Sequence, residues 1–318
     1  MNNQTHLHSD LPPYSYLDSR SLNSQIIAPA LIAYAAGDAF GVQFEFAPRR
    51  AHIIDLLEEK EGWPLGGVSD DTFLSLLTIE SLTETNPMKA AARFLENLRR
   101  DAPKLRGLGP TTRTALGMEV KENERGVIGN TNGAMMRTAL SGLAFSPSSA
   151  ALRREWITES ARTTHSHVSA ISCAVLMAAA FSEATHTDAA RNCGVLEALN
   201  REIDANDLIP HNVVQAIHSF DTWMPSEEGT SLDPLETLLA VLWSSLGAKD
   251  CKDVFSRACS LGGDTDTVAA LAGALYCAWN PTNHGLFSLQ WLPQVQWSEI
   301  ARIKQAIELI ITMRESHE

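Results

Sequence analysis

Two acid-rich turns hold the residues best suited to chemistry, and each stands at the start of an apolar segment. Residues 67–72 read Gly-Val-Ser-Asp-Asp-Thr, and residues 262–267 read Gly-Gly-Asp-Thr-Asp-Thr. The start of a helix needs about one capping oxygen for its free backbone N–H groups. Ser69 or Thr72 would cap the first helix, and Asp264 alone would cap the second. The remaining carboxylates exceed what capping requires.

The surplus carboxylates predict a bound cation. Asp70, Asp71, Asp264 and Asp266 would repel one another if the fold brought the two turns together, unless positive charge lay among them. Oxygen ligands suit hard divalent cations such as Mg²⁺ or Mn²⁺, and the turns offer no thiol. The alternative is that both turns only cap helices, which leaves their charge unexplained. We therefore expect a metal site shared by the two halves of the chain.

The segments that position these turns repeat with the period of an α-helix. Leucines after Pro234 and isoleucines between residues 300 and 311 recur at intervals of three and four, whereas alternating strand patterns are scarce. Several of these segments are apolar on most faces, which predicts an all-α fold with buried helices. The expected helices cover residues 26–36, 72–84, 88–100, 111–121, 149–161, 167–184, 188–204, 211–220, 235–246, 250–260, 267–279 and 300–311.

The chain divides into a short polar start and one large domain. No Gly/Ser linker or charge run interrupts residues 26–318, and the two acidic turns come from its opposite halves. Residues 1–25 are polar and contain two prolines, which favours a disordered tail. The alternative is an arm that docks on the body or on a partner through Tyr14, Tyr16 and Leu17.

Composition excludes several classes of function. The formal net charge of −13 over 318 residues disfavours nucleic acids and anionic membranes as partners. Five cysteines without C-x-x-C spacing argue against a disulfide framework or a zinc ribbon and fit a reducing cytoplasm. The most apolar run, residues 171–181, is shorter than the ~20 residues of a membrane span, and no secretory signal is visible. We expect a cytoplasmic protein without a nucleic-acid groove.

Five motifs, taken in order, resemble the ADP-ribosylglycohydrolase family, the group that contains the dinitrogenase reductase-activating glycohydrolase. The resemblance extends from about residue 26 to residue 279 and implies a single-domain orthogonal helical bundle. Each motif is weak alone, but their order is specific. They are Gly-Asp-Ala-Phe-Gly-Val-Gln-Phe-Glu-Phe (37–46), Ser-Asp-Asp-Thr (69–72), Asn-Gly-Ala-Met-Met-Arg (132–137), Thr-His (164–165) and Gly-Gly-Asp-Thr-Asp-Thr (262–267).

The resemblance implies two Mg²⁺ or Mn²⁺ ions and a catalytic set around them. The implied metal ligands are Ser69, Asp70, Asp71, Asp264, Asp266 and Thr267. Asp71 and Asp266 also join Glu45 as the implied catalytic residues. Glu45 would accept a proton or orient water, although its sequence context also suits a surface carboxylate. Asp38 is expected to cap or brace the first turn, and the glycines beside it would let the backbone turn sharply.

The implied substrate contacts are Asn132, Gly133, Ala134, His165 and Thr111. Small residues that open a helix let a phosphate approach backbone N–H groups, although packing alone could demand the same turn. The first histidine of the pair lies near the ligand cleft in the family, and a structural histidine is the alternative. Some relatives carry an aspartate just before the Thr111 loop, where this chain has Gly107.

The resemblance implies a hydrolase that removes ADP-ribose from a modified protein, with arginine as the expected linkage. Two cations would hold the ribose diol and activate water, and a nearby carboxylate would complete the proton transfer. One alternative is an immunity protein that blocks an ADP-ribosyltransferase toxin through its N-terminal arm, with or without hydrolysis. Another is a di-metal phosphohydrolase, which would release phosphate.

Overall fold

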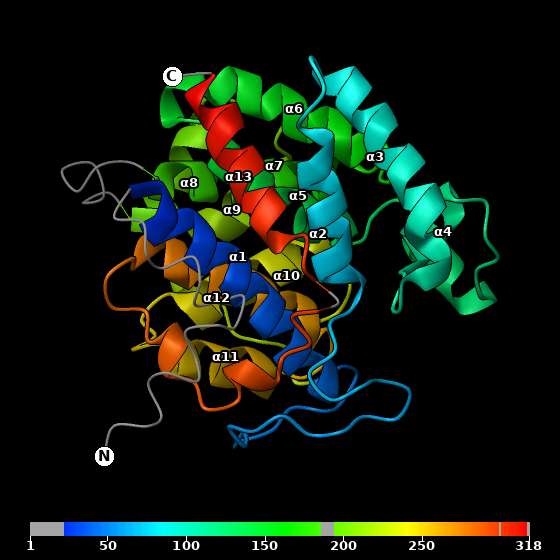
Figure 1. Cartoon of the computed structure of the whole chain (residues 1–318). Helices are drawn as coiled ribbons and strands as arrows, with labels where there is room; N and C mark the ends of the chain where they lie inside the picture. Colours follow the sequence, from blue (N-terminus) through cyan, green and yellow to red (C-terminus); the bar gives the residue numbers. More distant parts are fainter. Residues whose placement is uncertain (1–21, 186–193, 299, 317–318) are drawn as a thin grey trace.

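The computed structural model describes residues 22–185, 194–298 and 300–316, and these form an all-α fold (Figure 1). The α-helices are Leu22–Gly41 (α1), Asp70–Ser81 (α2), Pro87–Asp101 (α3), Pro110–Ala115 (α4), Gly133–Thr138 (α5), Ala150–Arg162 (α6), Val168–Ala184 (α7), Gly194–Asp204 (α8), His211–His218 (α9), Pro234–Ser245 (α10), Cys251–Ser260 (α11), Thr265–Trp279 (α12) and Ile303–Glu315 (α13). Short 3₁₀ helices are Val42–Phe44 (η1), Ala102–Lys104 (η2), Glu122–Val127 (η3), Ala139–Ala144 (η4), Pro147–Ser149 (η5), Phe220–Thr222 (η7), Leu286–Ser288 (η8) and Leu292–Gln294 (η9).

The predicted all-α class is confirmed. Within the described ranges, extended pairing is limited to two isolated bridges, Lys60 with Trp63 and Thr230 with Gly263. Most expected helices are present with ends shifted by a few residues. The helix expected over 111–121 is shorter, because α4 ends at Ala115 and Gly117 adopts a positive φ of 73°.

Helices α1 and α12 pack side by side at the centre of the molecule (Figure 1). Two glycines of α1 allow this close approach: a Cβ at Gly37 would lie 2.3 Å from the Ala269 carbonyl oxygen. A Cβ at Gly41 would lie 2.4 Å from the Asp266 Cα. Both glycines lie inside the helix, so the sharp turn expected there is wrong, and helix–helix contact explains the motif instead.

The long apolar helix α1 is a core element. The segment Gln25–Phe44 has the length and hydropathy of a membrane span, yet 94% of its most apolar window is buried inside the fold. Tyr34 in this helix donates a hydrogen bond of 2.8 Å to the Met136 carbonyl oxygen of α5. Helix α1 is therefore buried on all faces and is held against α12 and against α5.

The possible docking arm is largely outside the described part of the chain. Helix α1 begins at Leu22, and the three apolar side chains expected to dock, Tyr14, Tyr16 and Leu17, lie outside the described residues. The start of the helix predicted over 188–204 also lies outside them, and α8 is described from Gly194.

Candidate active site

The two acidic turns meet at one pocket of about 440 Å³. Asp70 and Asp71 enter it from the first turn of α2, and Asp264 and Asp266 enter it from the start of α12. Thr267 also lines the pocket. The structure thus brings together the two halves of the predicted metal site.

Asp38 braces the first acidic turn from the neighbouring helix α1. Its carboxylate accepts hydrogen bonds from the Ser69 N–H at 2.9 Å, the Thr72 N–H at 3.1 Å and the Thr72 hydroxyl at 2.5 Å. The Ser69 hydroxyl caps α2 by accepting from the Asp71 N–H at 3.1 Å. The predicted cap and the predicted supporting role of Asp38 are both confirmed. These bonds leave the carboxylates of the turn free to face the pocket.

The second acidic turn is shaped by two glycines and held by an asparagine. Gly262 and Gly263 adopt φ values of 71° and 73°, and a Cβ at Gly263 would lie 2.1 Å from the Thr230 carbonyl oxygen. The expected cap is wrong, because Asp264 stands at the N-cap of α12 without a side-chain capping bond. Its carboxylate instead accepts a hydrogen bond from the Asn132 side-chain amide.

Burial and mutual repulsion raise the carboxylate pKa values in this pocket. Burial raises the pKa of Asp264 to about 6, and it raises the pKa of Asp38 to about 6. The pKa values of Asp70, Asp71 and Asp266 lie well above the usual range because of burial, followed by neighbouring carboxylates. Without a cation the pocket therefore opposes full ionisation of its own side chains.

Within the pocket, two buried carboxylate oxygens have no hydrogen-bond partner among the described residues: Asp71 Oδ2 and Asp266 Oδ1. An unpaired buried carboxylate oxygen is costly unless a cation or ordered water satisfies it. Carboxylate oxygens of Glu45, Asp264 and Asp266 also lie within 4.8 Å of one another. An all-oxygen donor set of this charge fits a hard divalent cation.

Glu45 lies at the pocket edge and already has one cationic neighbour. It follows η1, is partly buried, and pairs with the Lys60 ammonium at 3.1 Å. Lys60 also donates a 2.6 Å hydrogen bond to the Val42 carbonyl oxygen, so this amine links the carboxylate to the start of η1. Phe46, the next residue, has a positive φ of 59° that turns the chain out of the pocket.

The predicted ligand element 132–134 lies partly in the pocket. Asn132 and Gly133 line it, whereas Ala134 is buried and is not among the lining residues. The Asn132 amide is engaged by Asp264 and by Thr237 Oγ1, at 2.9 Å from the latter, so it positions a carboxylate. Helix α5 starts at Gly133 without a capping side chain, so its first backbone N–H groups have no side-chain partner there.

His165 and Thr111 lie one layer behind the pocket wall. Thr131 lines the pocket, and its hydroxyl contacts His165 Nε2 at 2.9 Å and donates to the Thr111 hydroxyl at 3.0 Å. Burial, and next the charge of Arg137, lower the pKa of His165 to about 3, so the ring is neutral. Ser69 is also behind the wall. These three predicted residues support the lining rather than form it.

Several lining residues were not predicted. They come from several separate segments, and they are Phe46, Lys60, Trp63, Leu108, Glu124 and Leu232. Arg113, which ends the expected ligand-lining loop 109–113, also lines the pocket. Arg113 pairs with Glu124 at 2.7 Å. The tryptophan in Gly62-Trp63-Pro64 is the one local signal, because a large aromatic between turn residues is unusual in a solvated loop.

Gly107 occupies a position where no side chain fits. Its φ is +92°, and a Cβ there would lie 2.7 Å from Asp70 Oδ1. A carboxylate at this position would crowd the acidic turn, so Gly107 gives Asp70 room at the pocket wall.

Comparison with known proteins identifies the family of this chain. The family model for ADP-ribosylglycohydrolases matches residues 20–316. The chain belongs to the ADP-ribosylglycohydrolase family. A solved structure described as an ADP-ribosylglycohydrolase-related protein complex is 26% identical with a TM-score of 0.68, covering 93% of this chain and 100% of that one. The chain is therefore a glycohydrolase enzyme with the fold of this family.

Two curated relatives of this ADP-ribosylglycohydrolase also match most of the chain. An uncharacterized protein of Archaeoglobus fulgidus is 29% identical over 267 residues, covering 77% of this chain and 84% of the relative. The ADP-ribosylarginine hydrolase Tri1 of Pseudomonas putida is 26% identical over 290 residues, covering 85% of this chain and 74% of the relative.

Proposed function

We propose that this glycohydrolase removes ADP-ribose from modified arginine side chains of proteins and requires divalent cations, Mg²⁺ or Mn²⁺. The observation that carries the metal requirement is the pair of buried, unpartnered carboxylate oxygens on Asp71 and Asp266, which belong to opposite acidic turns. The arginine linkage rests on the similarity to the Pseudomonas putida hydrolase, whose name gives that substrate.

The proposed cation ligands are Asp70, Asp71, Asp264, Asp266 and Thr267, with Ser69 behind them. The Ser69 hydroxyl already accepts the capping N–H, but a hydroxyl oxygen keeps a second lone pair. Two divalent cations carry four positive charges, which would balance the four aspartates of the acidic turns. When bound, divalent cations supply positive charge and Lewis acidity toward oxygen.

The pocket can also hold the anionic part of the substrate. Arg113 and Lys60 are the cationic side chains among its lining residues, and each lies beside a carboxylate that keeps it in place. The uncapped start of α5 at Gly133 adds backbone donors. We place the pyrophosphate between these groups and the ribose at the acidic turns.

Glu45 is the proposed proton acceptor. It sits where carboxylates from α12 converge, and Lys60 holds one of its oxygens, so the other can orient a water molecule at the anomeric carbon. Water that attacks there loses its proton to Glu45 as the guanidinium nitrogen leaves. A wall of buried side chains excludes bulk water and fixes both reactants.

The test is release of ADP-ribose from defined substrates. Chelator-treated protein is incubated with peptides that carry ADP-ribose on arginine or on serine, with and without Mg²⁺ or Mn²⁺, and products are identified by mass spectrometry. We expect free ADP-ribose from the arginine peptide only when a cation is added. Release from serine alone would refute the linkage, cation-independent release would refute the metal requirement, and release of phosphate would indicate a phosphohydrolase.

A further inference from the structure

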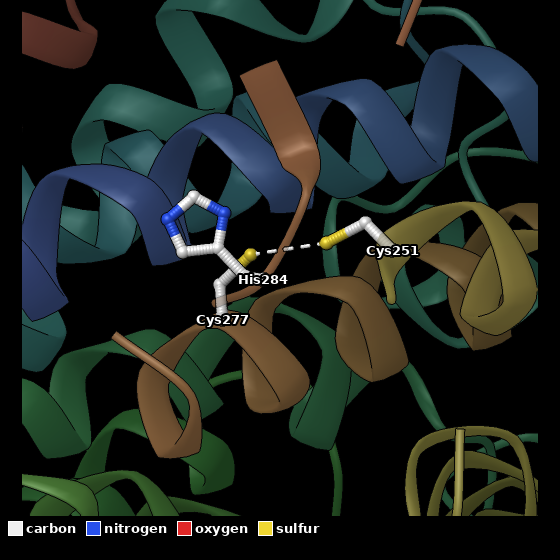
Figure 2. A group of neighbouring side chains, drawn as sticks. All are labelled: Cys251, Cys277 and His284. Carbon is white, nitrogen blue, oxygen red and sulfur yellow. Dashed lines mark hydrogen bonds between the residues drawn. The ribbon is translucent and has the colours of Figure 1, made fainter. Parts of the chain in front are cut away.

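A second group of metal-ligating side chains lies away from the pocket, at the other end of α12. Cys251 from α11, Cys277 from α12 and His284 from the following loop converge, with one ligand atom from each within 4.8 Å of the others (Figure 2). The two sulfurs are 3.3 Å apart and share a hydrogen bond. The acidic pocket uses none of these residues.

We infer that Cys251, Cys277 and His284 form a binding site for a soft, thiophilic cation of the Zn²⁺ or Cu⁺ class. Two thiolates and an imidazole are the donor types that such ions select over the oxygen donors used by Mg²⁺. This site is separate from the proposed hydrolytic centre and goes beyond the proposed function.

The distances suit an inserted ion. With Zn–S bonds of ~2.3 Å and tetrahedral angles, two zinc-bound sulfurs lie about 3.8 Å apart. The observed separation of 3.3 Å requires the sulfurs of Cys251 and Cys277 to part by roughly half an ångström. A rotation of either side chain provides this without moving a helix.

The site is held in place before any ion binds. The Cys251 N–H donates a 2.8 Å hydrogen bond to the His284 carbonyl oxygen, which ties the loop to the start of α11. A Cβ at Gly285 would lie only 3.1 Å from the Asp250 Cβ, so the loop packs tightly against this helix. Since the ligands need little ordering, the entropic cost of binding is small.

The imidazole is available as a neutral ligand. Burial lowers the pKa of His284, and its Nδ1 accepts a 3.1 Å hydrogen bond from the Leu286 N–H. An ion that takes Nδ1 replaces this hydrogen bond. Thr282 and Asn283 next to it are exposed, so His284 lies close to the protein surface.

A disulfide between the two thiols is the competing chemistry. Both cysteines are fully buried, and burial raises the pKa of Cys277 well above its usual value. A buried, protonated thiol is a poor nucleophile toward oxidants, whereas a cation that reaches it displaces the proton directly. Burial therefore slows oxidation of this pair.

Cobalt(II) tests the site, because thiolate ligands give it a near-ultraviolet charge-transfer absorption that carboxylates do not. Reduced, chelator-treated protein is titrated with Co²⁺ in excess Mg²⁺, which fills the acidic pocket. We expect one equivalent of Co²⁺ to produce the thiolate absorption, and Zn²⁺ to displace it. A parallel titration with Cu⁺ in the presence of a competing chelator measures binding of the second candidate ion.

Variants separate the three ligands from general loss of structure. Cys277→Ser and His284→Ala should each weaken Co²⁺ binding by more than ~100-fold, whereas Cys173→Ala, which removes a buried thiol from α7, should not. Circular dichroism identifies variants that fail to fold. Absence of thiolate absorption and of Cu⁺ binding in the folded wild type overturns the proposal. So does rapid conversion of Cys251 and Cys277 to a disulfide in air, detected as a mass lower by two hydrogens.

Discussion

Two buried groups of charged side chains in this protein differ in whether they have counter-charges. Glu202 of α8 is 2% exposed, and its two oxygens pair with Arg153 and Arg154 of α6, each at 2.6 Å. In the pocket, Asp71 and Asp266 are equally buried but face other carboxylates, and each keeps an unpartnered oxygen. The first group carries its own counter-charges and serves structure. The second lacks them, which is the property expected of a site that binds cations.

The largest expected effect is on catalysis. Asp71→Asn should lower ADP-ribose release by about 100-fold or more, because it removes charge that the proposed cations require. Its free energy of unfolding without metal should not fall, since one of several repelling carboxylates is gone. Asp221→Asn, an exposed aspartate of η7, is the control. A fully active Asp71→Asn variant would show that the pocket carboxylates do not bind a catalytic cation.

The paired group should show the reverse behaviour. Glu202→Gln leaves two guanidinium groups near each other, one of them buried, and should lower the free energy of unfolding by about 3 kcal/mol in urea denaturation. Activity per folded molecule should not change. Glu197→Gln, on the exposed face of the same helix, should have little effect on either measurement. If Glu202→Gln were as stable as the wild type, the pairing would not support the fold.

Stabilisation of the protein by Mg²⁺ should depend on the pocket carboxylates and not on the Glu202 ion pair. At a Mg²⁺ concentration about 100 times its dissociation constant, the wild type should gain about 2.7 kcal/mol in the free energy of unfolding for each bound cation. Glu202→Gln should gain the same amount from its lower starting point, whereas Asp266→Asn should gain much less. Equal gains in all three proteins would place the cation elsewhere.

The smallest expected effect concerns His165, a buried group kept neutral. Its folded pKa of about 3 is below the usual 6.5, so the unfolded chain binds an extra proton between these values. Stability is therefore lost as pH falls below about 6.5. Between pH 7 and pH 5 the wild type should lose about 2 kcal/mol more than His165→Asn, measured by urea denaturation. Parallel pH profiles would show that the ring is not held neutral.

The sequence predicted the helices and the types of residue at the site better than it predicted the contacts between those residues. Apolar residues at intervals of three and four identify a helix wherever they occur, and the two acidic turns have more carboxylates than caps require. The contact of Asn132 with Asp264 was not predicted, because it joins segments far apart in the chain. Lys60 and Trp63 were missed because irregular loops carry no period.

The sequence by itself determined the all-α class, the order of the family motifs and the presence of two acidic turns, because each depends on residues close together in the chain. Tertiary structure alone decided that the two turns share a pocket, that Gly37 and Gly41 serve helix packing, and that Cys251, Cys277 and His284 converge. The packing of α1, α2, α11 and α12 creates these proximities, and the spacing of residues along the chain does not predict them.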